Sequence, residues 1–257
     1  SFIETSFGVK ISEEQFSNLK NILDIAKYIK DNGGEYHQEN LDWKSILNQD
    51  IDVPLPKSSF MIGFTRLLFK PIFMLYFRLR KLDTDKIPKT PAIYVGNHQS
   101  FLDAFIFNQA MPSSKLKDTY FIAVAVHFDT PLRRYLADRG NIIIIDINKN
   151  LKETLQISAK VLKEGKNLVI FPEGARTRDG ELQEFKKTFA ILSKELNIPV
   201  VPFGIRGAYE AMPYGSSFPK ATPIDIKFFD EIEPEELTID EIVKDTKKEI
   251  HDWLSEE

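Results

Sequence analysis

The amino-acid sequence predicts an α/β fold in which helices flank a mixed, largely parallel sheet. Short apolar runs rich in β-branched residues alternate with segments of helical periodicity, the pattern of a sheet covered by helices. Several runs, such as 141–147, are apolar along nearly their whole length, as strands buried on both faces are. A chain of 257 residues, 42% of them hydrophobic, suffices for one main domain with a small appendage.

The chain divides into three segments. Residues 1–35 are helical and acidic, residues 36–59 are predicted to form a polar linker, and residues 60–257 form the α/β unit. Strands are expected at 92–95, 121–126, 141–147, 168–171, 200–205 and 224–229, with helices near 102–110, 130–139, 151–164, 185–196 and 236–254. Pro202 within the fifth strand indicates an edge, a bulge or a strand end. Because sites in such sheets gather at the carboxyl ends of strands, residues directly after strands are the functional candidates.

Composition excludes several kinds of chemistry. The sequence has no cysteine, so disulfides, thiolate nucleophiles and cysteine-ligated zinc are excluded, and four histidines argue against a histidine-rich metal site. No basic leader followed by an apolar run opens the sequence, so no signal peptide is expected. Residues 60–220 carry 24 Lys and Arg against 15 Asp and Glu, a net charge of +9. This basic middle suits a phosphate, coenzyme A, an acidic carrier protein or anionic lipid, although a solvated basic face explains it equally well.

Residues 60–82 have the character of a membrane-surface segment. Five cations interrupt this very apolar stretch, namely Arg66, Lys70, Arg78, Arg80 and Lys81. Its charge-free stretches are far shorter than the ~18–20 residues that span a bilayer. The cations fall within one arc of a helical projection, and Pro71 is expected to kink or split the helix. These features predict a pair of amphipathic helices in the headgroup plane. The alternative is a core helix whose lysines and arginines extend to water.

His98 and Asp103 follow the first expected strand, in the sequence GNHQSFLDAF. An imidazole titrates in the range useful for removing a proton from an alcohol, and a carboxylate that accepts its other N–H fixes the tautomer. Asp103 lies about one helical turn into the following helix, from where it can reach back to the ring. Asn97 is expected to shape the turn and Ser100 to cap the helix, with nearby helix N-terminal amides stabilising an oxyanion. A capping turn with a hydrogen-bonded histidine is the alternative.

Two further blocks follow later strands. In LVIFPEGARTRDG, Gly174 marks a turn, Arg176 suits bidentate phosphate binding, and Glu173 is expected to bind a substrate hydroxyl or to fix Arg176. A tight turn with solvated charges explains this block equally well. In NIPVVPFGIRG, Val201 and Phe203 either line an acyl-chain tunnel or belong to the core.

Taken in order, these blocks resemble the lysophospholipid and glycerophospholipid acyltransferase family, typified by 1-acylglycerol-3-phosphate acyltransferase. The motif N-H-x-S-x-x-D is complete at 97–103, F-P-E-G with a following arginine is complete at 171–176, and V-P is present at 201–202. The resemblance spans about residues 60–235. It departs from the family at Ile147, where an arginine is expected, and Lys149 is a weaker substitute for binding phosphate. Thr188 likewise stands where family members often have glycine.

The resemblance implies a role for each candidate. His98 is the general base and Asp103 its orienting partner, while Glu173, Gly174 and Arg176 contact glycerol phosphate. The full set of substrate-binding candidates is Asn97, Ser100, Lys149, Glu173, Gly174 and Arg176. The implied reaction moves a fatty acyl group from acyl-CoA or an acyl-carrier protein to a lysophospholipid such as 1-acylglycerol-3-phosphate, with no metal, cofactor or nucleic acid. The expected location is the membrane surface on its cytoplasmic face, with the protein bound peripherally.

Two other functions remain open. One is the same chemistry with glycerol-3-phosphate or a zwitterionic lysophospholipid as the acceptor. The other is a catalytically silent module that docks to a membrane or a carrier protein. A hydrolase that uses Ser100 as nucleophile lacks a second histidine at a convincing position, since His127 is expected to be structural.

The N-terminal segment has a resemblance of its own. Residues 2–33 resemble the second half of an acyl carrier protein, in which FGVKIS precedes the helix LKNILDIAKYI. The serine that carries phosphopantetheine in such carriers would precede Ser1. The resemblance implies that the chain is a fragment of a larger fusion carrying its own acyl donor. An unrelated helical extension is the alternative.

Overall fold

The structure, a computed structural model, describes residues 22–32, 43–49, 51, 53–56, 60–125, 128, 130–145 and 151–256. The chain divides into two compact units, Ser1–Trp43 and Lys44–Glu257. In the first unit, helix α3 (Ile22–Asp31) lies where the sequence predicts a helix. The rest of the carrier-like segment, at 2–21 and at 33, lies outside the described residues, so that resemblance stays a prediction.

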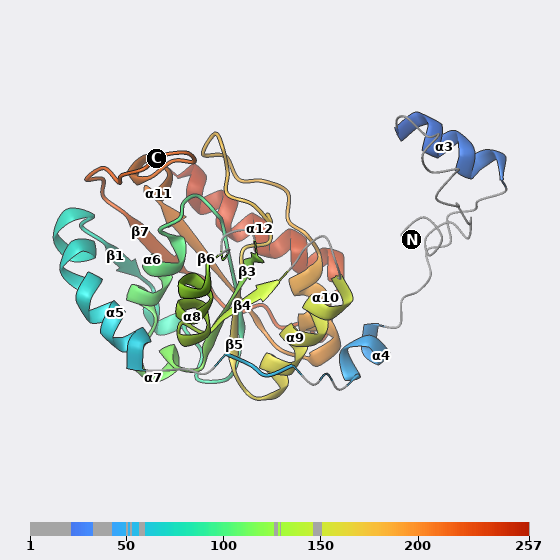
Figure 1. The fold of residues 1–257 in the computed structure, drawn as a ribbon, viewed down its shortest axis with the longest axis horizontal. Helices are drawn as coiled ribbons and strands as arrows, with labels where there is room; N and C mark the ends of the chain where they lie inside the picture. The colour runs from blue at the N-terminus through green and yellow to red at the C-terminus, as the bar shows by residue number, and fades with distance from the viewer. Residues whose placement is uncertain are drawn as a thin grey trace. The chain divides into compact units, whose positions relative to one another are not determined.

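Within the described part of the second unit, seven strands form one sheet in the order β1-β7-β6-β2-β5-β3-β4 (Figure 1). The strands are β1 (Arg80–Leu82), β2 (Ile93–Gly96), β3 (Thr119–Val124), β4 (Ile142–Ile145), β5 (Asn167–Ile170), β6 (Val200–Arg206) and β7 (Asp225–Phe228). Neighbouring strands pair in parallel except β6 and β7, which are antiparallel. The mixed, largely parallel sheet expected from the sequence is therefore confirmed.

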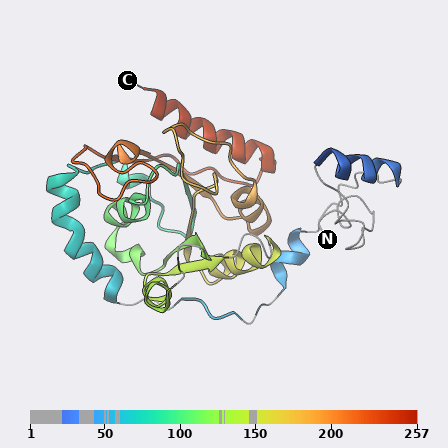
Figure 2. The same cartoon turned by 45° about the horizontal axis from the view of Figure 1, so that its top comes forward.

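Helices cover both faces of this sheet. One face carries α6 (Asp103–Ala110) and α8 (Pro131–Arg139), and the short helices α7 (Ser113–Leu116) and α11 (Ala208–Ala211) follow α6 and β6 in the chain. The other face carries α9 (Leu151–Lys163), α10 (Thr188–Leu196) and α12 (Ile239–Ser255) (Figures 1 and 2). Local sequence sets several helix starts. Thr130 accepts a hydrogen bond from the Arg133 amide at the start of α8, and Thr238 forms a capping box with Glu241 at the start of α12.

Strand order brings two distant loops together at one edge. Strand β2 lies between β5 and β6 and is parallel to both, so the carboxyl ends of all three strands meet at the same edge. The loop after β2 carries His98, and the loop after β5 carries Glu173. Segments 75 residues apart in sequence are thereby made neighbours, as their hydrogen bond confirms.

Aromatic rings fill the core on the α6 side of the sheet. Phe107 of α6 lies 5.4 Å from Tyr94 of β2 and 4.8 Å from Phe203 of β6, measured between ring centroids. Phe228 of β7 closes the group at 5.8 Å from Phe107. All of these side chains, and that of Val201, are fully buried. Val201 and Phe203 therefore belong to the core, and the structure does not support the tunnel alternative for them.

Gly96 ends β2 where no side chain fits. A Cβ at this position would overlap the Phe203 ring, which neighbouring rings enclose. We therefore expect Gly96→Ala to lower the free energy of unfolding by about 1–3 kcal/mol, the usual cost of overpacking a core. Chemical denaturation measures the change. Gly63→Ala is the matched control, because a Cβ there meets open space; equal destabilisation by both substitutions would contradict the account.

Pro202 lies in a central strand, and the bulge alternative explains how the sheet accommodates it. Its carbonyl accepts a hydrogen bond from the Phe229 amide, so its backbone faces the side of β7. The pairing shifts by one residue on this side: Pro202 faces Phe229, whereas Val200 bridges Ile232. The extra residue therefore lies on the strand opposite β6, between Phe229 and Ile232, directly beside the position where the proline lacks an N–H.

The linker prediction for 36–59 is wrong for the described residues between Lys44 and Pro56. Helix α4 (Trp43–Asn48) lies in this range, and the side chain of Leu47 is buried. Lys163 Nζ donates to the Leu47 carbonyl at 2.6 Å, and Tyr120 donates to the Pro56 carbonyl at 3.1 Å. Side chains of the α/β body thus satisfy backbone carbonyls that a free linker would leave to water.

The predicted helix pair at 60–82 is correct in its first half and wrong in its second. Helix α5 (Phe60–Pro71) passes directly into a single π-helical turn at Ile72–Tyr76, and the chain then enters β1. Residues 80–82 pair with β7, and Arg80 Nε donates to Asp225 Oδ1 at 2.6 Å. Strand β1 has only three residues, two of them charged, so its hydrophobic pattern is too short to be predicted from the sequence. No helix among the described residues is long and apolar enough to cross a bilayer.

Candidate active site

The structure brings His98 and Asp103 into direct contact. His98 Nδ1 lies 2.8 Å from Asp103 Oδ2, which is hydrogen-bond distance. The carboxylate is completely buried, whereas the histidine side chain retains 24% exposure. An Nδ1–H that donates to this carboxylate leaves Nε2 as the unprotonated nitrogen. That tautomer, with Nε2 free on the partly exposed ring, is the one that a general base requires.

Asp103 is held by the backbone that precedes it. Its Oδ2 accepts hydrogen bonds from the amides of Gln99 (2.7 Å) and Ser100 (2.8 Å) as well as from His98. Burial raises the pKa of Asp103, and these donors counteract the rise because they stabilise the ionised carboxylate. The amides near Ser100 are thus used within the dyad. The expectation that they stabilise an oxyanion is wrong for Gln99 and Ser100.

The ring of His98 is also fixed from the side. It stacks on Phe171, with ring centroids 4.4 Å apart and planes inclined by 18°. The His98 carbonyl accepts a hydrogen bond from the Thr177 amide at 2.9 Å. The loop after β5 therefore supports both the side chain and the backbone of His98.

The carboxylate of Glu173 connects the loop after β2 with a later part of its own loop after β5. Oε1 accepts a hydrogen bond from the His98 amide at 2.7 Å, and Oε2 accepts one from the Gln183 amide at 3.1 Å. Burial raises the pKa of Glu173, while these two amides counteract the rise. The structure thus gives Glu173 a positioning role, because both oxygens already bind backbone donors. It shows no bond from Glu173 to Arg176, the partner that the sequence suggested.

Cations and an aromatic ring surround the turn after β5. Gly174 adopts a φ of +76°, and the Lys186 ammonium occupies the space that a Cβ at this position would take. The guanidinium groups of Arg176 and Arg178 lie 5.0 and 5.4 Å from the centre of the Tyr214 ring. This stacking leaves the donors of both guanidiniums available for an anion at the rim of the site.

Asn97 and Ser100 have structural contacts and are not part of the open site. The Asn97 amide group donates to the Ile205 carbonyl at 2.8 Å and accepts from the Ile205 amide at 2.7 Å, which ties β2 to β6. Ser100 donates to the Met212 carbonyl at 2.9 Å and accepts from the Leu102 amide. Both side chains are buried. Their assignment as substrate-binding residues is corrected accordingly.

The remaining candidates fall in two groups. Lys149 and His127 lie outside the described residues, so their assignments stay predictions. Arg206 donates to the Trp253 carbonyl, and its guanidinium lies 4.3 Å from the centre of the Trp253 ring. It therefore joins β6 to α12.

Four residues contribute to the site without having been singled out by sequence: Phe171, Gln183, Lys186 and Tyr214. Phe171 lies inside the F-P-E-G block, so its place in the motif was a usable signal. Lys186 precedes helix α10, and its amide donates to the Pro172 carbonyl at 3.0 Å. Tyr214 follows α11 in a loop without a recognisable motif, and no sequence signal could have placed it beside Arg176.

Known proteins are similar to this chain in sequence and in fold. The family model described as Acyltransferase matches residues 78–206, which is half of the chain. The 1-acyl-sn-glycerol-3-phosphate acyltransferase of Limnanthes douglasii is 30% identical over 176 residues, which are 67% of this chain and 60% of that protein. The Cocos nucifera protein of the same name is 29% identical over 60% of this chain and 50% of its own length.

A solved structure has a similar fold over most of the chain. The 1-acyl-sn-glycerophosphate (LPA) acyltransferase PlsC from Thermotoga maritima superimposes with a TM-score of 0.64 at 20% identity, covering 77% of this chain and 81% of that one. This likeness concerns the fold. The chain spans 60% or less of the length of the plant relatives above. With a family match over half of its residues, the chain belongs to the acyltransferase family.

Proposed function

We propose that the protein is a membrane-surface O-acyltransferase that acylates a lysophospholipid such as 1-acylglycerol-3-phosphate. The acyl donor is a thioester, either acyl-CoA or an acyl-carrier protein. One observation carries the proposal: a partly exposed imidazole bonded through Nδ1 to a buried carboxylate at the edge where three parallel strands end. The matches to 1-acyl-sn-glycerol-3-phosphate acyltransferases support the choice of acceptor.

The proposed reaction begins with proton transfer to His98. Nε2 accepts the proton of the acceptor hydroxyl as its oxygen attacks the thioester carbonyl carbon. The resulting imidazolium is stabilised by the Asp103 carboxylate across the 2.8 Å contact. When the tetrahedral intermediate collapses, the carbon–sulfur bond breaks, an ester remains, and the thiolate takes the proton back from His98. Neither proton nor electron is left over.

The stacked arginines supply the proposed contact for the acceptor phosphate. Arg176 and Arg178 lie together against Tyr214, and Lys186 lies over the neighbouring Gly174 turn. Three cations beside the dyad suit a dianionic phosphate monoester, which forms charge-assisted hydrogen bonds with guanidinium donors. The phosphate would thus hold the glycerol backbone while its free hydroxyl meets His98.

Membrane docking is proposed for α5 and the turn that follows it. Apolar side chains there are open to solvent, including Leu67 (69%), Leu75 (72%) and Phe64 (56%). Such side chains gain stability in the apolar layer of a bilayer. The helix lies along the outside of the domain, packed on α6 (Figure 2). This placement supports peripheral binding at a lipid surface.

An acceptor panel with Arg176→Gln tests the phosphate contact. We expect the variant to raise KM for 1-acylglycerol-3-phosphate about tenfold or more, because a charge-assisted bond to phosphate contributes about 1.5–3 kcal/mol. KM for a neutral monoacylglycerol should be unchanged. Steady-state kinetics with one acyl donor give both values, and Arg139→Gln on α8 is the control for loss of a surface charge. Equal effects on both acceptors would contradict the assignment.

A further inference from the structure

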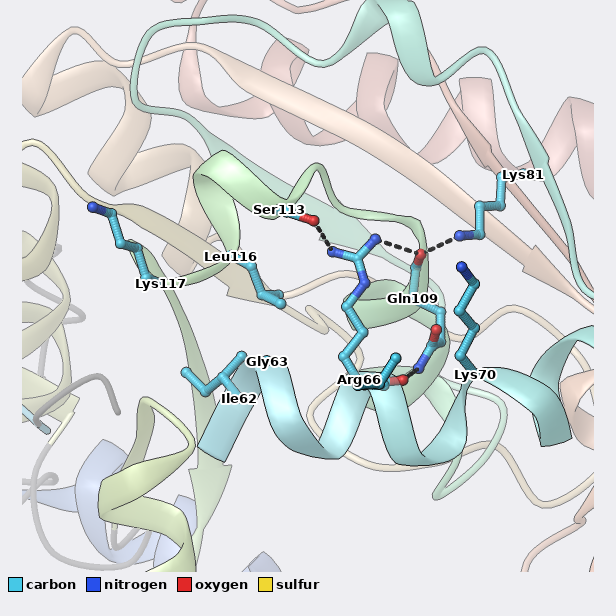
Figure 3. Close-up of a pocket in the computed structure, with 10 residues that line it drawn as sticks. Ile62, Gly63, Arg66, Lys70, Lys81, Gln109, Ser113, Leu116 and Lys117 are labelled. Carbon is cyan, nitrogen blue, oxygen red and sulfur yellow. Dashed lines mark hydrogen bonds between the residues drawn. The ribbon is translucent and has the colours of Figure 1, made fainter. Parts of the chain in front are cut away.

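A basic cleft lies between α5 and the α6–α7 corner, away from the dyad. It has a volume of about 480 Å³ and is lined by four cations, Arg66, Lys70, Lys81 and Lys117. Figure 3 shows Arg66 and Lys70 projecting from α5 toward Lys81 of β1 and Gln109 of α6. Side chains from three separate elements thus converge on one space.

The cations in this cleft are not neutralised by the described residues. Arg66 donates to the Gln109 carbonyl at 3.2 Å and to Ser113 Oγ at 3.3 Å, and Lys81 donates to the same carbonyl. These acceptors are neutral, and no carboxylate is among the described residues that line the cleft. None of the four cations forms an ion pair with any carboxylate in the described part of the chain.

Burial and mutual repulsion both disfavour this arrangement in the absence of an anion. Burial lowers the pKa of Arg66. Burial also lowers the pKa of Lys81, and the charges of Arg66 and Lys70 lower it further. Like charges that are held close together at a partly buried surface favour the binding of an anion.

The faces of α5 indicate where that ligand comes from. Gly63, Arg66 and Lys70 share the face toward the cleft, at helical spacing. The adjacent face presents Phe64 and Leu68 to solvent, more than half exposed. Leu67 belongs to both, since it lines the cleft and is itself largely exposed. Cations beside an apolar ridge match the boundary between phosphates and acyl chains in a bilayer.

We propose that this cleft binds the phosphate of an anionic phospholipid that belongs to the bilayer and does not react. The site is separate from the dyad, because Asp103 begins α6 while Gln109 lies six residues along it, about 9 Å farther down the helix axis. A lipid phosphate there would fix the depth and orientation of the domain while the acceptor occupies the active site. The inference rests on the proposed membrane docking.

The test uses Gly63, because a side chain there meets open space at the mouth of the cleft. Gly63→Glu places a carboxylate among the cations, and Gly63→Gln is the isosteric control without charge. One assay titrates each protein with dihexanoyl phosphatidylglycerol, kept below its micelle concentration, and follows amide NMR shifts. A second assay measures co-sedimentation with phosphatidylcholine vesicles, with and without phosphatidylglycerol. Thermal unfolding confirms that each variant is folded.

We expect saturable binding of the short-chain lipid by the wild type and by Gly63→Gln. For Gly63→Glu, the affinity for this lipid and for the phosphatidylglycerol vesicles should fall by about fivefold or more. A loss of this size is the effect of about one charge at a lipid surface. Equal binding by the two variants would overturn the proposal that the cleft binds lipid phosphate. If vesicles still bind through the apolar side chains of α5, the proposed membrane docking stands. Binding of inorganic phosphate or coenzyme A that is as tight as that of the lipid and is weakened by Gly63→Glu would place a soluble anion in the cleft and overturn the bilayer as the source. The absence of wild-type binding to any vesicle would overturn it as well.

Discussion

Replacing His98 with alanine is expected to lower kcat for acyl transfer by about 10²–10⁴-fold, the usual contribution of a positioned general base. The change removes the nitrogen that is proposed to take the hydroxyl proton, while the proposed phosphate contact of the acceptor at Arg176 remains. KM should therefore change little. Steady-state kinetics with a labelled acyl donor measure both constants.

The same substitution should preserve the fold. The His98 side chain is partly exposed, whereas its backbone amide and carbonyl, which bind Glu173 and Thr177, are unaffected. His251→Ala on α12 is the matched control, because that histidine is 62% exposed and distant in sequence from the dyad. Near-normal turnover in a folded His98→Ala protein would eliminate the dyad as the source of catalysis.

Asp103→Asn is expected to lower kcat by a similar factor, about 10²–10⁴-fold. The new amide oxygen can accept from the amides of Gln99 and Ser100, so the loop geometry should persist. The negative charge that stabilises the imidazolium is lost. Circular dichroism should show native secondary structure, and kinetics should show the loss in kcat.

The double variant His98→Ala, Asp103→Asn tests whether the two residues act together or independently in catalysis. Residues that act as one unit lose their effect together, so the double variant should be about as slow as His98→Ala alone. Independent roles would instead multiply the two losses. Asp252→Asn, an exposed carboxylate on α12, is the control for the charge change. A multiplied loss in the double variant would show that Asp103 does not act through His98.

The sequence predicted the parts of the site that depend on local order. His98 and Asp103 are separated by four residues, and the apolar run before them predicted the strand that places them at an edge. Helix geometry then brings the carboxylate back to the ring, as observed at 2.8 Å. The parallel strands could be predicted because strands buried on both faces are continuous apolar runs. The helix positions could be predicted from hydrophobic periodicity.

What the sequence could not supply depends on contacts between distant segments. The role of Glu173 follows from β5 lying beside β2, a matter of strand order that periodicity does not encode. The burial of Asn97 depends likewise on β6, which lies 108 residues along the chain from it. The packing of Leu47 on the body could not be read from a polar segment that resembles a linker.

The most direct test follows the acyl group itself. Purified protein is given a thioester with a labelled acyl chain and 1-acylglycerol-3-phosphate on vesicles, and the labelled products are separated by chromatography. We predict that the label moves from the thioester into a diacylglycerol phosphate, in an amount equal to the thiol released. Release of the label as free fatty acid, or an unchanged thioester with the acceptor present, would contradict it.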